Sequence, residues 1–141
     1  MSAGYSGTPL AKKLGLKDGM RALLVGVPDV LPDISGFPGF AGVEHVVSPS
    51  AGRVFDYAHV FEMDRARLEA LVTAIRAALK PDGMVWISWP KKASKVKTDI
   101  TEDVLRVIFL PTGLVDVKVA AMDETWSGLK FMFRKELRAS L

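Results

Sequence analysis

Residues 79–92 read LKPDGMVWISWPKK and decide the fold class of this chain. Pro81 and Gly83 interrupt the helical pattern before them, and residues 84–88 form an apolar run that ends abruptly at Trp-Pro-Lys-Lys. A strand covered on both faces carries such a continuous run, whereas a half-exposed strand alternates apolar and polar residues. The stretch therefore predicts the central strand of a parallel sheet. Because ligands of open α/β sheets bind beyond the carboxyl ends of the strands, a site is expected just after this run.

The rest of the chain alternates between strand-like and helix-like segments. Helices are predicted over residues 10–14, over 65–79 behind the capping residue Asp64, and from 99–102 up to Gly113. Pro and Gly residues over 28–42 leave room there for one or two helical turns at most. Strands are predicted over residues 20–27, 43–47, 55–62, 84–88, 114–122 and 129–135.

This order of elements predicts an α/β fold with three layers, Rossmann-like and similar to methyltransferases. We expect one domain over residues 1–141, with a mostly parallel sheet, a shortened first half and a C-terminal antiparallel hairpin. The 141 residues can bury a core without cross-links, and the absence of cysteine excludes disulfides and thiolate chemistry. No stretch approaches the ~20 apolar residues of a membrane span, so the sequence predicts a cytoplasmic protein with no membrane partner.

Three segments resemble the second half of class I methyltransferases: FDYAHV at 55–60, LKPDGMVWI at 79–87 and GLVDV at 113–117. Members of that family have a Gly-rich turn after the first strand and an acid at the end of the second, which together hold S-adenosylmethionine. Here the turn reads VGVPD at 25–29, and the predicted second strand ends VVS at 46–48 without an acid. We therefore expect no S-adenosylmethionine site and no cofactor.

The whole sequence is similar to a bacterial family of small domains of unknown function. Its signature segments are GYSGTPLAKKLG at 4–15, SWPKKAS at 88–94 and DETWSGLKF at 123–131. This resemblance implies a bacterial protein and no particular activity.

A candidate site follows if the last strand pairs beside the central strand, because residues 123–127 and 89–92 then meet at one sheet edge. Two indoles could form apolar walls there while lysines hold an anionic group. Alternatively, the indoles seal the core, and the charges pair in solvent. The candidate ligand-binding residues are Trp89, Lys91, Lys92, Asp123, Glu124, Trp126 and Lys130.

The sequence favours a non-enzymatic module that binds a small anionic ligand or a protein, and it permits a homodimer. One alternative is a small enzyme acting on an anionic metabolite at the Trp89/Trp126 edge, with Asp123 and Glu124 as acid and base. Another is nucleic-acid binding through the lysines of residues 91–97, with Trp89 stacking on a base. His45 and His59 are interpreted as hydrogen-bonded structural histidines, because two isolated histidines make no metal site.

Overall fold

The computed structural model describes residues 9–47 and 52–141, and a six-stranded sheet in the order β2–β1–β3–β4–β6–β5 lies at its centre. Neighbouring strands from β2 to β4 are parallel, while β6 runs antiparallel to both β4 and β5. The last strand is therefore inserted beside the central one, as predicted. The strands are β1 (Arg21–Val25), β2 (Gly42–Glu44), β3 (Phe55–Phe61), β4 (Leu79–Pro90), β5 (Leu114–Ala121) and β6 (Trp126–Phe133).

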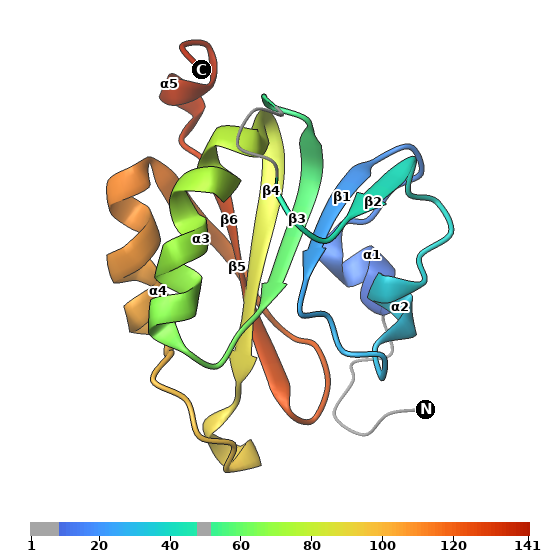
Figure 1. Cartoon of the computed structure of the whole chain (residues 1–141), viewed down its shortest axis with the longest axis vertical. Helices are drawn as coiled ribbons and strands as arrows, with labels where there is room; N and C mark the ends of the chain where they lie inside the picture. Colours follow the sequence, from blue (N-terminus) through green and yellow to red (C-terminus); the bar gives the residue numbers. More distant parts are fainter. Residues whose placement is uncertain (1–8, 48–51) are drawn as a thin grey trace.

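Helices cover both faces of the sheet, which confirms the three-layer α/β architecture. The longer helices α3 (Arg65–Ala78) and α4 (Glu102–Phe109) lie on one side of the sheet, and α1 (Leu10–Leu14) and α2 (Pro32–Ser35) lie on the other (Figure 1). The connection between β1 and β2 contains only the single turn of α2, so the first half is shortened as expected. The remaining short elements are η1 (Lys92–Ser94), η2 (Leu110–Thr112) and α5 (Lys135–Arg138).

The side chains of β4 alternate between two apolar cores. Val85 and Ile87 belong to the core beneath α3 and α4, whereas Trp86 belongs to the core beneath α1 and α2. All three are fully buried. The apolar run that predicted a doubly covered strand is confirmed.

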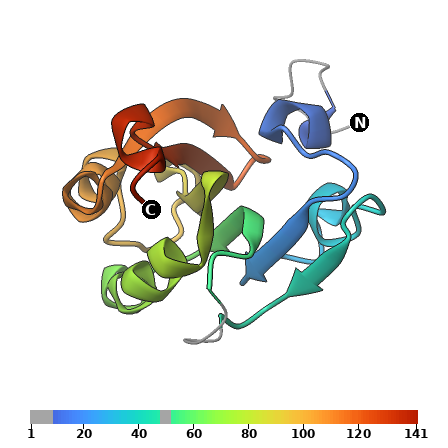
Figure 2. The ribbon, with the colours of Figure 1, turned by 90° about the horizontal axis from the view of Figure 1, so that it is seen from above.

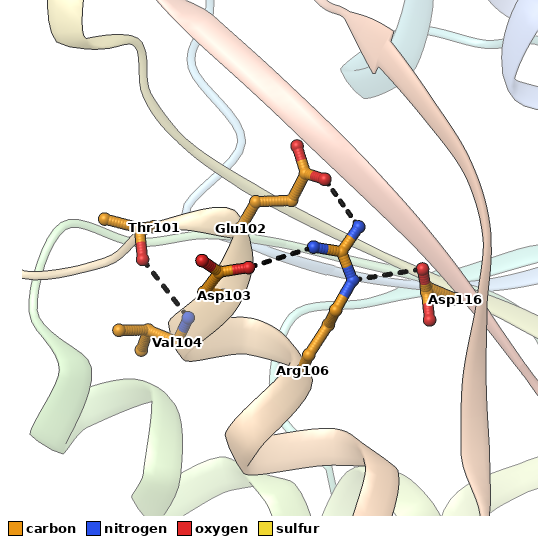
Figure 3. Close-up of polar contacts among 6 residues, drawn as sticks. All are labelled: Thr101, Glu102, Asp103, Val104, Arg106 and Asp116. Atoms are coloured by element: carbon orange, nitrogen blue, oxygen red, sulfur yellow. Dashed lines mark hydrogen bonds and ion pairs between the residues drawn. The ribbon is translucent and has the colours of Figure 1, made fainter.

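Helix α4 begins later than predicted, because Thr101 rather than Asp99 caps it. The Thr101 hydroxyl oxygen accepts a hydrogen bond from the Val104 N–H at 3.2 Å. Arg106, one turn further on, forms ion pairs with Glu102, Asp103 and Asp116 (Figure 3). The helix start is therefore fixed by a cap and by a cation that neutralises the acids of the first turn.

Several strand boundaries differ from the prediction, and β4 differs most, because it begins at Leu79 instead of residue 84 and includes Pro81 and Gly83. Strand β2 ends at Glu44. Beyond it, His45 Nδ1 donates a hydrogen bond to the Leu24 carbonyl at 2.9 Å, and Val46 is 78% exposed. Strand β6 begins at Trp126, not at residue 129, and includes Gly128. Within the described ranges, no helix is long and apolar enough to cross a membrane.

Candidate functional site

The loop between β5 and β6 lies beside the carboxyl end of β4, as the sequence predicts. Trp126 pairs with Pro90 across the two strands, and the Lys91 N–H donates to the Thr125 carbonyl at 2.7 Å. The edge where a ligand was expected is therefore built from these two segments. The segment that follows β4 emerges at the lower end of the sheet in Figure 1.

The two candidate indoles do not share a wall, because they lie on opposite faces of the sheet. Trp89 belongs to the core under α3 and α4 and is only 8% exposed. Trp126 packs partly buried against the other core, where its ring meets the edge of the Phe61 ring at a centroid distance of 5.1 Å. The interpretation of one pocket lined by both tryptophans is wrong.

The remaining candidates are also separated. Asp123 stabilises the turn: its Oδ1 accepts hydrogen bonds from the N–H groups of Thr125 at 2.8 Å and Trp126 at 2.7 Å. Glu124 is exposed on the same turn. Lys130 lies within β6, opposite Trp86, and is not at the edge. The seven candidates do not form one contiguous surface.

A groove at the end of β4 contains part of the predicted site. It has a volume of about 430 Å³ and lies between the strand end, the following loop and the start of α4. The described residues that line it include three lysines and no carboxylate. They are Trp89, Pro90, Lys92, Lys95, Val96, Lys97, Thr98, Ile100 and Thr101.

Hydrogen bonds fix the loop that carries the groove lysines, which we define as Lys92, Lys95 and Lys97. The Thr98 hydroxyl donates to the Met63 carbonyl at 2.6 Å, and Asp99 Oδ1 accepts from the Arg65 N–H at 2.7 Å. Ile100 is buried below the loop. The loop is thus joined to the start of α3 and presents its ammonium groups from a defined backbone.

Lys95 has an unusual backbone conformation. Its φ of 61° falls in the left-handed region, and it is the only described residue other than glycine with a positive φ. Such a conformation costs a non-glycine residue roughly 1–2 kcal/mol. A lysine at this C-cap of η1 therefore suggests a role for the side chain that glycine could not fill.

The groove lysines have no negative partner within the chain. Across residues 9–47 and 52–141, none of the three forms an ion pair. The other residues, 1–8 and 48–51, contain no Asp or Glu. A smaller hollow of about 250 Å³ shares Lys97 and Thr98 with the groove, but its acids Asp64 and Asp99 accept backbone hydrogen bonds at the start of α3.

A buried polar chain lies elsewhere, between β3 and β4. His59 Nε2 is 2.7 Å from the Ser88 hydroxyl, and its Nδ1 is hydrogen-bonded to the Tyr57 hydroxyl. Burial lowers the pKa of His59 to about 3 and raises the pKa of Tyr57. The spacing matches a nucleophile and its base, but all three side chains are fully buried and no substrate can reach Ser88. The interpretation of His59 as a hydrogen-bonded core histidine is confirmed.

The turn after β1 is shaped by a close contact with β3 and by a proline. Gly26 has φ +71°, and a Cβ placed there would lie 2.7 Å from the Phe61 carbonyl oxygen, so contact with β3 already requires this glycine. Pro28 follows and has no N–H to offer. Contrary to our expectation, β2 does end in an acid, Glu44, but its carboxylate pairs with Arg21 at 3.1 Å. In the described part of the chain, no three His, Asp or Glu residues are placed to hold a metal ion.

Comparisons with known proteins bear on the fold. Neither a scan against protein-family models nor a search of curated proteins finds a match. Among solved structures, the chain is similar to a SAM-dependent methyltransferase from Aquifex aeolicus, with 15% identity and a TM-score of 0.61 over 89% of this chain and 88% of that one. The chain has a methyltransferase-like fold.

Two further structures agree. A TehB-like SAM-dependent methyltransferase from Corynebacterium glutamicum shares 16% identity, with a TM-score of 0.53 over 94% of this chain and 91% of the other. Magnesium protoporphyrin IX methyltransferase from Synechocystis, with bound SAM, shares 8% identity, with a TM-score of 0.57 over 89% and 74%. At these identities the likeness shows the fold alone, and the resemblance to the bacterial family of unknown function stays a prediction.

Sequence reasoning considered the lysines of residues 91–97 only for nucleic-acid binding, and it missed that Lys95, Val96 and Lys97 line a groove. A sequence signal for this groove was Ile100, an isolated isoleucine that follows Thr98 and Asp99 in the loop after β4. A single large apolar residue at the end of a basic loop indicates that the loop is anchored to the core there.

Proposed function

We propose that this chain is a non-enzymatic module that binds a small anionic ligand in the groove at the end of β4, on a methyltransferase-like fold without a functional S-adenosylmethionine site. The observation that carries the proposal is that three lysines, Lys92, Lys95 and Lys97, line one groove and form no ion pair in the described part of the chain. Unpaired like charges repel one another, and a bound anion relieves that repulsion.

The shape of the groove indicates the chemistry of the ligand. Its volume of about 430 Å³ lies within the usual range for small-molecule sites. Pro90 and Val96 offer apolar contacts near the lysines, so the ligand combines a compact apolar part with at least one negative group. The rigid loop lowers the cost of ordering these side chains on binding.

The second part of the proposal rests on the contacts at the ends of β1 and β3. Gly26 and Pro28 leave the first turn poorly suited to approach a cofactor, and Glu44 is engaged by Arg21. Trp126 packs on Phe61, the last residue of β3. These contacts support the proposal that internal packing occupies the place of a cofactor site.

The alternatives receive less support from the same contacts. An enzyme using Asp123 and Glu124 would need two acids at a cleft, but Asp123 holds a turn and Glu124 is exposed. Nucleic-acid binding would need an accessible stacking surface, and Trp89 is only 8% exposed. A protein partner and a homodimer stay predictions.

The test uses 1-anilinonaphthalene-8-sulfonate, a fluorescent aromatic sulfonate that combines the two properties expected of the ligand. We expect Lys92→Gln and Lys95→Gly to weaken its binding at least about five-fold, which corresponds to roughly 1 kcal/mol. Lys91→Gln is the matched control, because Lys91 is adjacent in sequence but does not line the groove. Its affinity should stay within about two-fold of the parent protein, since its side chain does not line the groove.

Lys95→Gly also separates binding from folding. Glycine adopts a positive φ without strain, so the free energy of unfolding should change by no more than about 1 kcal/mol while the probe binds more weakly. The groove is not a ligand site if Lys92→Gln, Lys95→Gly and Lys91→Gln all bind the probe as tightly as the parent protein does. The same conclusion follows if the parent protein shows no saturable binding.

A further inference from the structure

A second group of lysines gathers on the opposite side of the sheet, beneath the end of α1. Lys118 of β5 and Lys130 of β6 are directly opposite each other across the antiparallel pair. Lys17, which follows α1, is close enough for its charge to act on Lys130. We define these three residues as the α1-side lysine cluster. Figure 2 shows α1 beside the hairpin that carries two of them.

The cluster is held in place by contacts to α1. The Lys118 ammonium group donates to the Lys13 carbonyl at 3.0 Å. The Trp86 indole N–H donates to the Leu14 carbonyl at 3.2 Å, and Trp86 is the neighbour of Lys130 on β4. Two hydrogen bonds therefore hold the end of α1 against the sheet, next to the neighbouring residues Trp86, Lys130 and Lys118.

The positive charges of the cluster are not balanced by the chain. No ion pair links Lys17, Lys118 or Lys130 to a carboxylate among residues 9–47 and 52–141, and the other twelve residues contain no acid. Burial, followed by the charges of Lys118 and Lys17, lowers the pKa of Lys130. Like charges directly opposite each other in a sheet are destabilising, and a bound anion would relieve this repulsion.

We infer that the α1-side lysine cluster is an anion site that binds a phosphate group, separate from the groove and on the other face of the sheet. A phosphate carries up to two negative charges and several acceptor oxygens, which suits ammonium groups arriving from two strands and a helix end. Lysine is a common phosphate ligand because it acts as a compact point charge. The inference does not depend on the proposed function.

The experiment measures thermal stability in inorganic phosphate and in sodium chloride of equal ionic strength. For the parent protein we expect phosphate to raise Tm by a few degrees more than chloride does, because a ligand of the folded state stabilises it. Lys118→Gln and Lys130→Gln should each abolish this extra shift. Lys118→Gln also loses the hydrogen bond to the Lys13 carbonyl, so the phosphate response is measured against chloride within each variant.

The matched control is Lys12→Gln, which removes an exposed lysine of α1 outside the cluster and should retain the phosphate response. A titration of the Lys130 ammonium group by NMR should show its pKa rising when phosphate is added. Comparison with glycerol 3-phosphate distinguishes the source: tighter binding assigns the site to a phosphate ester, and weaker binding assigns it to the free ion. A response equal to that in chloride, or one that persists in both cluster variants, would overturn the inference.

Discussion

His59 illustrates how one buried residue can make stability depend on pH. Its ring stacks against the rings of Phe61 and Trp86, and both of its nitrogens are hydrogen-bonded to hydroxyl groups. A protonated imidazole would have two donors to place where the neutral ring has one, in a site shielded from water. The folded state therefore keeps this histidine neutral.

The expected consequence is a loss of stability in mild acid. The pKa of His59 is about 3 in the folded chain, whereas an unfolded histidine titrates near 6.5. As pH falls below 6.5 the unfolded state binds the proton first, so stability is complete above that value and declines toward pH 3. Between pH 7 and pH 5 this group should cost about 2 kcal/mol, measured by urea unfolding at both values.

A comparison of the two histidines isolates the effect. His59→Gln should lower stability at pH 7 but reduce the difference between the two pH values, because glutamine does not titrate. His45→Gln is the matched control, because it removes the other histidine, which is exposed. If His59→Gln keeps the full pH dependence, other groups are responsible.

At the scale of elements, Gly128 shows what decides the course of the terminal hairpin. Sequence patterns place it in a loop, but it lies inside β6, opposite Ser88. A Cβ at this position would lie 2.5 Å from Met122 Cε, 3.1 Å from the Ser88 hydroxyl oxygen and 3.2 Å from the Trp86 ring. Glycine thus allows β6 to approach the side chains above β4.

Replacement of Gly128 should lower the stability of the protein, although its φ is not in the left-handed region. We expect Gly128→Ala to lower the free energy of unfolding by about 1–3 kcal/mol, the range for overpacking a close-packed core. Gly42→Ala is the matched control in β2, because a Cβ there meets only Arg21 Nε at 3.7 Å. Chemical denaturation of both variants measures the difference. Equal stability of the two proteins would show that Met122 and its neighbours move aside without cost.

For the whole molecule, the contacts of the turn after β1 lead to a simple binding prediction. Calorimetric titration with S-adenosylmethionine should give no saturable heat at micromolar to millimolar concentrations, because the turn containing Gly26 and Pro28 is committed to internal contacts. Parallel titration of a methyltransferase of the same fold is the positive control. Saturable binding with micromolar affinity would contradict the prediction and favour an enzyme.

The fold could be predicted from sequence because it depends on patterns that are local. The apolar run of β4 and the apolar stripe of α3 indicate directly which residues are buried. The site depended on register, which is not local. Trp126 pairs with Pro90 and not with Trp89, and this one-residue difference places the two indoles on opposite faces. The capping roles of Thr101 and Asp99 likewise depended on which helix each residue approaches in space.

The bulge in β5 has a consequence for how the molecule avoids unwanted association. Asp116 is opposite Phe131 and Lys118 is opposite Lys130, so Val117 is the extra residue and the two charges lie on different faces. Any foreign strand adding to this open edge would have to bury a carboxylate on one side and an ammonium group on the other. In a regular strand without the bulge, positions 116 and 118 would share one face, and the other face of this edge would carry no charge there. The bulge in β5 thus disfavours the addition of foreign strands at this edge, and with it fibrous aggregation.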